Sequence, residues 1–270
     1  MPKALIVALA LIAAPPALAQ IAPPEQAAID HARARGELIY WYDQAAWHGT
    51  DDMLASAKDL APSIGGWIVD GPANAAELIF YSRGPDPRPL YWARFAGGKL
   101  AESRKLGEAD GAMLTPQRRR MIAALGSARK ALVEAKVSRC ADKPFNTVVL
   151  PPATPDGPVP VYFLTPQTEH GVLPLGGHYL FEVDAAGQAG PVRRFTNSCI
   201  ALPTTDDKAP DGGRTAALFI THLLDPVPTE IHFFSTMAAR KPIYVGIGEK
   251  VWAIAPNARG ASASLAKTGK

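Results

Sequence analysis

Three short segments in the middle of the chain, NTVVL (146–150), VPVYFL (159–164) and GHYLFEV (177–183), carry the pattern that decides the fold. Each is rich in β-branched and aromatic residues and lies close to proline or glycine, which is typical of strands joined by turns. The third segment is followed by the turn sequence Asp184-Ala185-Ala186-Gly187 and then by residues 191–199. We therefore predict a strand-rich region with a hairpin at its centre.

Residues 1–19 have the composition of a secretory signal peptide. Lys3 supplies a positive start, an apolar run extends from Ala4 to Ala14, and Ala17-Leu18-Ala19 forms a small-residue cleavage site before Gln20. The apolar run is shorter than the roughly 20 residues that span a bilayer, and no later run reaches that length. We expect a mature chain without a transmembrane segment, exported to the periplasm or secreted into the medium.

The only two cysteines, Cys140 and Cys199, flank the strand-rich region. In an oxidising compartment two cysteines most simply form one disulfide. It would close a loop of roughly 60 residues and stabilise the fold by about 4 kcal/mol through the entropy of the denatured chain. The alternative is a thiolate nucleophile at Cys199, activated by a histidine. We favour the disulfide, because a free reactive thiol survives poorly in such a compartment.

Charge and composition narrow the class of protein. The chain has 28 lysine and arginine residues against 25 aspartate and glutamate residues, and the predicted signal peptide removes one lysine. This near balance gives no support to nucleic acid, or to an anionic membrane surface, as a partner. The 26 prolines and 23 glycines indicate many turns, and hence a strand-rich protein with a sizeable core rather than a helical bundle.

The first part of the mature chain is expected to alternate short helices and strands. A helix is predicted from Glu25 to Arg35, where Gly36 ends it, followed by a strand over ELIYWY (37–42) and a helix that begins at the N-cap Thr50. Closely spaced strands are then expected near 67–69, 77–81, 90–95 and 99–103. Their turn sequences favour an antiparallel meander.

The clearest helix is predicted from Pro116 to about Lys136. Thr115 is a good N-cap, proline suits the first helical position, and apolar residues recur at spacings of three and four. The other face is basic and carries Arg118, Arg119, Arg120, Arg129, Lys130 and Lys136. Such a face is most often simply solvated, and the alternative is a groove for an acidic partner.

The last part of the chain is predicted to be mostly strands. An apolar run over 216–224 suits a strand or a short helix, and three antiparallel strands are expected over 230–236, 242–245 and 250–255. Residues 257–270 are small and polar, so we expect them to be disordered.

These elements define an α+β fold class. The N-terminal half would hold helices beside a mostly antiparallel sheet, and the C-terminal half would be nearly all β, as a sandwich or a partial barrel. In residue numbers, the prediction is a signal peptide at 1–19, a first half at 20–137, a disulfide-linked second half at 138–256 and a tail at 257–270.

Four residues of the second half are a candidate zinc site: His178, His222, Glu230 and His232. On a strand, Glu230 and His232 would point to the same face, and with the other histidines they could supply the ligands of a metal that activates water. In such a site Glu182 or Glu230 could act as the base. Their spacing matches no standard ligand pattern. Hydrogen-bonded structural histidines are the more common interpretation, so zinc is only an alternative.

Aromatic residues form a second candidate site. Tyr40, Trp41, Tyr42, Trp47, Tyr91 and Trp92 could line a groove for a sugar or a peptide. Aromatic residues in strands are more often part of the core.

The sequence therefore predicts an exported globular protein that binds an unknown protein or envelope ligand, without catalysis and without a cofactor. The chain lacks the common short catalytic motifs, and no catalytic residue is identified. The alternative function is a metal-dependent hydrolase that uses the histidine and glutamate cluster. A third possibility is a thiol enzyme that uses Cys199.

Overall fold

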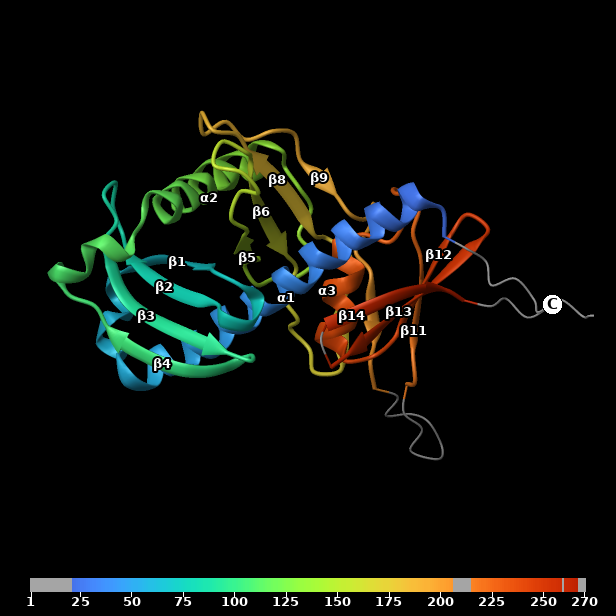
Figure 1. The fold of residues 1–270 in the computed structure, drawn as a ribbon, viewed down its shortest axis with the longest axis horizontal. Helices are drawn as coiled ribbons and strands as arrows, with labels where there is room; N and C mark the ends of the chain where they lie inside the picture. Colours follow the sequence, from blue (N-terminus) through green and yellow to red (C-terminus); the bar gives the residue numbers. More distant parts are fainter. Residues whose placement is uncertain (1–20, 206–214, 259, 267–270) are drawn as a thin grey trace, which may run out of the picture.

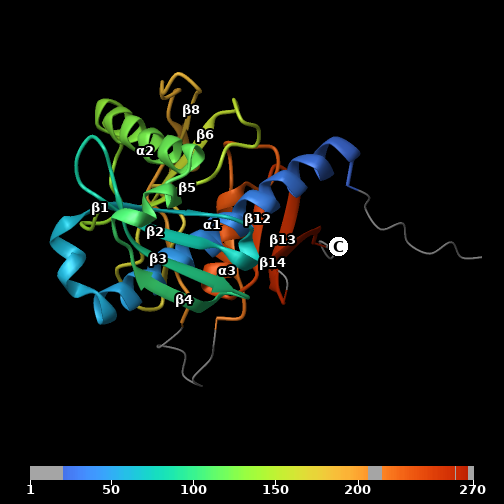
Figure 2. The same cartoon turned by 60° about the vertical axis from the view of Figure 1, so that its left-hand side comes forward.

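One long helix, α1 (Pro23–Ser56), runs along the length of the molecule and has sheets packed around it (Figure 1). The computed structural model describes residues 21–205, 215–258 and 260–266. The predicted signal peptide lies outside the described residues. Seen after a rotation of 60°, α1 lies behind one sheet at its C-terminal end and beside another sheet at its N-terminal end (Figure 2).

The first sheet is the predicted antiparallel meander. Its strands follow one another in the order β1 (Ile64–Asp70), β2 (Glu77–Ser82), β3 (Pro89–Ala96) and β4 (Lys99–Lys105). Short 3-10 helices flank and interrupt it, at Lys58–Ser63, Ala73–Ala75 and Glu108–Met113. Helix α2 (Pro116–Glu134) follows, and Thr115 caps it by accepting a hydrogen bond from the Arg118 N–H. The predictions for these elements are confirmed.

The middle of the chain forms a second antiparallel sheet, in the order β5 (Asn146–Val149), β6 (Val159–Leu164), β8 (Tyr179–Val183) and β9 (Arg193–Arg194). The predicted turn after β8 is present, since the Asp184 N–H donates to the Gln188 carbonyl. Two short strands, β7 (Val172–Pro174) and β10 (Ala201–Pro203), pair with each other as a separate antiparallel sheet. In the chain, β7 lies between β6 and β8, and β10 follows β9.

The third sheet has the order β11 (Leu218–Thr221), β12 (Ile243–Ile247), β13 (Lys250–Asn257) and β14 (Gly260–Leu265). Its pairing is antiparallel except between β11 and β12, which are parallel. Helix α3 (Glu230–Ala239) connects these two parallel strands. The fold class is therefore α+β with mostly antiparallel sheets, as predicted, and the described residues form no closed barrel.

Helix α1 corrects the prediction of two short helices separated by a strand. Its buried positions recur every three or four residues without a break, at Ile29, Ala32, Gly36, Ile39, Tyr42, Ala45, Gly49 and Met53. The aromatic segment 37–42 therefore continues the helix. Tertiary packing on both sides of the helix overrides the local preference of these residues for a strand.

Helix α3 corrects the prediction of a strand at 230–236. The helix is buried on all sides, from Glu230 to Met237, so no polar face marks the helical period in the sequence. Thr229 and His232 form its capping box, with the histidine ring in the position usually taken by glutamate or glutamine. The box is therefore hidden from a motif search.

Strand β14 corrects the prediction of a disordered tail for residues 260–265. The strand consists of small residues, and it pairs along its whole length with β13. The Glu37 carboxylate of α1 accepts a hydrogen bond of 3.0 Å from the Ala261 N–H. Residues 267–270 lie outside the described residues.

The disulfide between Cys140 and Cys199 is present, with the two Cα atoms 5.4 Å apart. It joins the segment after α2 to the segment after β9. No free cysteine remains in the described chain, so the alternative of a Cys199 nucleophile is wrong. The predicted boundary near residue 137 stays a prediction, although residues from both sides of it share the same buried clusters.

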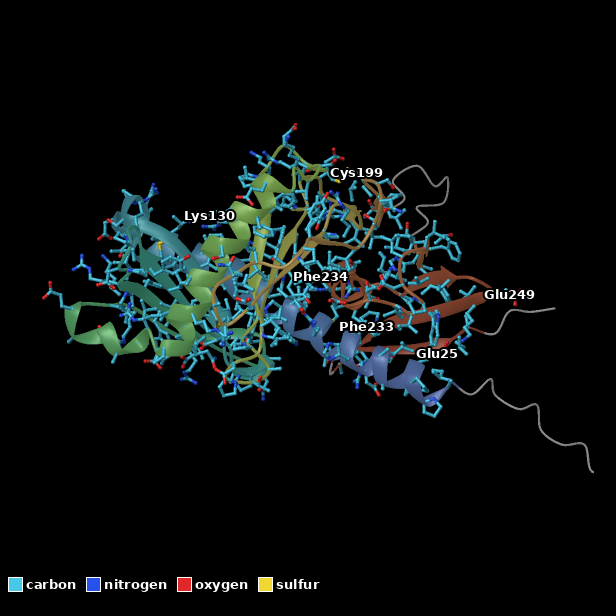
Figure 3. The ribbon with its side chains drawn as sticks, turned by 90° about the horizontal axis from the view of Figure 1, so that it is seen from above. Glu25, Lys130, Cys199, Phe233, Phe234 and Glu249 are labelled. Atoms are coloured by element: carbon cyan, nitrogen blue, oxygen red, sulfur yellow. A yellow bond between two sulfur atoms is a disulfide. The ribbon has the colours of Figure 1, made fainter. Side chains whose placement is uncertain are left out.

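The two buried helices cross at Gly36. A Cβ atom at this position would lie 2.5 Å from the Glu230 carbonyl oxygen and 2.6 Å from the Phe233 Cβ. Figure 3 shows Phe233 and Phe234 close to α1 at this crossing. The glycine therefore permits a backbone approach that no larger residue allows.

We predict that Gly36→Ala destabilises the protein by about 1–3 kcal/mol, because overpacking forces the helices apart. The matched control is Gly126→Ala in α2, where nothing lies within 4 Å of the new Cβ. That change should stabilise the protein by about 0.5–1 kcal/mol through helix propensity. Urea unfolding of both variants measures the difference, and equal effects would contradict the close crossing.

Candidate functional site

Polar and charged side chains from four separate parts of the chain meet where α3 faces the β5–β9 sheet. We call this group the polar cluster. Helix α1 contributes one residue, the sheet three, the segment after β11 two, and α3 two. They are Arg35, Tyr162, Glu182, Arg193, His222, Asp225, Glu230 and His232. Tyr162, His222, Glu230 and His232 are buried, whereas Glu182 and Arg193 are exposed. Clusters of charged groups that are partly shielded from solvent are candidates for function.

Glu230 lies at the centre of the polar cluster and is 4 % exposed. Its carboxylate accepts a hydrogen bond of 2.9 Å from the Tyr162 hydroxyl. The Nε atom of Arg35 and the Nη2 atom of Arg193 each lie 3.9 Å from its oxygens. Burial, and then the charge of Glu230, raise the pKa of Tyr162 well above its usual value. The tyrosine therefore remains a neutral hydrogen-bond donor.

Aromatic rings support the two arginines. Arg35 lies over the Tyr162 ring at 5.6 Å and Arg193 lies over the Phe195 ring at 4.7 Å, and these two rings stack on each other. Arg35 Nη1 is 3.5 Å from the Glu182 carboxylate. Its Nε and Nη2 atoms are buried and make no hydrogen bond within the described chain. Both guanidinium groups are thus held in fixed planes beside Glu230.

His222 and Asp225 form a hydrogen-bonded pair, with 3.0 Å between Nε2 and Oδ2. This bond lowers the pKa of Asp225, whose other oxygen lies 3.0 Å from Arg193. The ring of His232 stands perpendicular to that of His222, at 4.8 Å between centroids. The His232 Nδ1 accepts a hydrogen bond of 2.9 Å from the Thr229 N–H. Burial lowers the pKa of His232 to about 3, so its ring is neutral near pH 7.

His178 has a structural environment. Its Nδ1 accepts a hydrogen bond of 3.1 Å from the Thr165 N–H, and its Nε2 lies 3.2 Å from the Pro174 carbonyl oxygen. Since Nδ1 is an acceptor, Nε2 carries the proton and donates to Pro174. Burial lowers the pKa of His178 to about 4. Both nitrogens are thus occupied, because they join the residue before β8 to the end of β7 and to the residue after β6.

The predicted zinc ligands do not converge. The structure brings His222 and His232 together, but Glu230 bonds to Tyr162 and both nitrogens of His178 are occupied. The prediction that Glu230 and His232 point to the same face is wrong, because both lie on helix α3, and residues two positions apart on a helix point in different directions. Within residues 21–205, 215–258 and 260–266, no group of three or more histidine, cysteine or acidic side chains is arranged to hold a metal ion.

Five of the six aromatic candidates belong to the core or pack against it. Tyr42, Tyr91 and Trp92 are buried, and Tyr40 and Trp41 are partly buried against the core clusters. Trp47 is 59 % exposed and stacks on His48. The set therefore does not form a groove. A cavity of about 330 Å³ lies elsewhere, between the start of α1 and β14. Its charged groups are engaged with each other and with the backbone, since Arg33 pairs with Asp30 and Glu37 accepts from Ala261.

The outer end of the third sheet exposes large apolar side chains. Phe219 on β11 and Tyr244 on β12 are register partners, and they are 58 % and 36 % exposed. Leu223 and Leu224 follow β11 and are 81 % and 42 % exposed. We call these four residues the β11 edge. A concentration of exposed apolar residues on one strand and its continuation is typical of an interaction surface.

Sequence reasoning missed half of the polar cluster. Arg35, Tyr162, Arg193 and Asp225 were not among its candidates, although Asp225 follows His222 at a spacing of three. That spacing was the one available signal. The other contacts join residues far apart in the chain, such as Tyr162 and Glu230, and only the folded arrangement reveals them.

Comparison of the chain with models of protein families, with curated proteins and with solved structures finds no match in any of the three. None of the helices in the described part of the chain combines the length and the apolar character that spanning a bilayer requires.

We predict that the free energy of unfolding falls as the pH drops from about 6.5 toward 4. The unfolded histidines bind protons near pH 6.5, whereas folded His178 and His232 do so only near 4 and 3. The unfolded state then holds more protons, so each residue costs about 1.4 kcal/mol per pH unit in this range.

Urea unfolding at several pH values measures this slope. His178→Asn and His232→Asn should each make it shallower, because the amide oxygen can replace Nδ1 as an acceptor and does not titrate. His31→Gln, at an exposed position on α1, is the control and should leave the slope unchanged. A slope equal in all four proteins would contradict the assignment.

Proposed function

We propose that this protein is exported, to the periplasm or the medium, and that it acts there by binding a polypeptide partner rather than by catalysis. The observation that carries the proposal is the β11 edge, an unprotected strand edge with exposed apolar side chains. The disulfide supports an oxidising compartment. His222, Glu230 and His232 of the polar cluster are buried and already hydrogen-bonded within the protein, which favours a structural role for them.

The backbone of β11 is suited to pairing with another strand. The N–H groups of Leu218 and His222 donate toward β12, to the carbonyls of Pro242 and Gly246. Because backbone groups alternate in direction along a strand, those of Phe219 and Thr221 face away from β12. Among the described residues, β11 pairs with β12 alone.

The side chains near this edge do not protect it. Strands β11 (LFIT) and β12 (IYVGI) contain neither a charged residue nor a proline. Natural edge strands usually carry such residues, which prevent pairing with other chains. An apolar edge that lacks them suits an extended polypeptide segment with apolar side chains, which would add to the sheet as a further strand.

We predict that Phe219→Ser lowers the capture of a partner by the tagged mature protein from an envelope extract by at least about tenfold, the loss expected for an interfacial aromatic anchor. The control is Trp47→Ser, which removes an aromatic side chain of equal exposure, 59 % against 58 %, on α1. Quantitative mass spectrometry compares the captured proteins. A partner retained by Phe219→Ser, or lost equally by Trp47→Ser, would contradict binding through this edge.

Export is tested separately. We expect the mature protein to begin at Gln20 and to appear in the periplasmic or extracellular fraction, because the preceding residues have the form of a cleavable signal. Intact-mass spectrometry of the native protein from each cell fraction gives the answer. A chain that retains residues 1–19 in the cytoplasm would refute export and leave the binding experiment unaffected.

A further inference from the structure

We propose that the protein docks on an anionic membrane surface through cations at the end of α2 and just beyond it. We call this the basic surface, and it consists of Arg129, Lys130, Lys136, Arg139, Lys143 and Arg194. The proposal rests on the proposed function, which places the protein in an envelope, next to a membrane. Its physical basis is a local excess of charge that the near-neutral whole chain conceals.

The positive charge is concentrated in one stretch of the chain. Residues 116–143 contain eight basic and two acidic residues, so that the remainder has 20 basic against 23 acidic residues. Three of the eight basic residues form ion pairs or hydrogen bonds with other parts of the chain. Arg118 bonds to Asp70 and Glu77, Arg119 pairs with Asp86, and Arg120 donates to two carbonyls of the β5–β6 loop. The other five belong to the basic surface.

The cations of the basic surface are exposed and unneutralised. All six side chains are exposed, and none forms an ion pair within the described chain. The acidic residues of the same stretch are Glu134 and Asp142, and Arg139 bonds to the backbone carbonyl of Asp142 rather than to its carboxylate. The surface therefore has a net positive charge.

Arg194 lies beside the segment that follows α2, although it is far away in sequence. Its guanidinium is 5.4 Å from the centre of the Tyr179 ring, and the Tyr179 hydroxyl donates a hydrogen bond of 2.7 Å to the Ser138 carbonyl. In Figure 1, α2, β8 and β9 all lie along the upper side of the molecule. Figure 3 looks down on that side and shows Lys130 on it. Arg194 is thus brought next to the segment that carries Lys136, Arg139 and Lys143.

An exposed apolar residue among the cations favours a lipid surface over a soluble polyanion. Val133 is 76 % exposed and lies between Lys130 and Lys136 in the chain. At a membrane interface the valine leaves water for the acyl region while the lysines remain with the headgroups. A nucleic acid or an acidic polysaccharide offers the cations the same attraction but gives the valine no apolar environment.

Cosedimentation of the purified mature protein with vesicles tests the proposal. We compare vesicles of phosphatidylcholine with vesicles that also contain phosphatidylglycerol, at low and at physiological salt. Binding is expected only to the anionic vesicles and should weaken as salt is added. The triple variant Arg129→Gln, Lys130→Gln, Lys143→Gln should bind at least about tenfold more weakly, since each such charge contributes about fivefold.

The control variant removes three exposed cations from other surfaces: Lys58→Gln, Lys99→Gln and Arg240→Asn. This control has the same net charge as the first triple variant, and it should bind anionic vesicles as tightly as the parent protein does. The single variant Val133→Ser should bind anionic vesicles more weakly than the parent protein at physiological salt, and it should bind heparin as the parent does. Circular dichroism of each variant confirms that it is folded.

Three results would overturn the proposal: no binding to anionic vesicles, equal binding to neutral vesicles, or equal losses in the two triple variants. Binding to heparin without binding to vesicles would also overturn it and would identify a soluble polyanion as the partner. These outcomes are separable from the proposed function, because vesicle binding depends neither on export nor on the β11 edge.

Discussion

The crossing of α1 and α3 at Gly36 is the contact on which the arrangement of the other elements depends. Helix α1 is shared by the buried clusters of the first and third sheets, and α3 joins it to the third sheet and to the polar cluster. The distance between the two helices therefore sets the distance between the sheets. Arg35 precedes the crossing glycine and Glu230 begins α3, so the central charges of the cluster are positioned by the same contact.

The polar cluster explains why this crossing has one arrangement rather than several. Three carboxylates and two guanidinium groups meet in it, from α1, the second sheet, the segment after β11 and α3. A displacement of α1 or α3 would separate Arg35 from Glu230, which is 4 % exposed, and a buried charge that loses its partner costs several kcal/mol. A packed apolar contact would tolerate small displacements better. His232 adds a dependence on pH, because burial lowers its pKa to about 3 and so keeps the ring neutral at pH values where it is protonated in the unfolded chain.

An element could be predicted from the sequence where residues next to one another in the chain determine its conformation. The meander, α2, the strands between the cysteines and the disulfide were predicted from adjacent residues, because caps, turns and periodicity mark them. The central part of α1, residues 36–49, and helix α3 could not be predicted as helical, because tertiary contacts decide their conformation. Strand β14 was missed since its small residues gain stability only by pairing with β13. For the site, the histidines could be found as a group, but their partners come from distant segments.

The two surfaces proposed for binding differ in chemical character: one is apolar and the other is positively charged. The β11 edge is apolar and belongs to the third sheet, whereas the basic surface is formed by α2, the segment that follows it and β9. They lie on different parts of the molecule (Figure 1), and no residue is common to both. One can therefore be occupied without obstructing the other. Charge pairing inside the first half makes this separation possible: Asp70, Glu77 and Asp86 neutralise the arginines at the start of α2, so the unpaired charge remains at its far end. A membrane-bound protein would then hold its strand edge away from the lipid, available to an extended polypeptide.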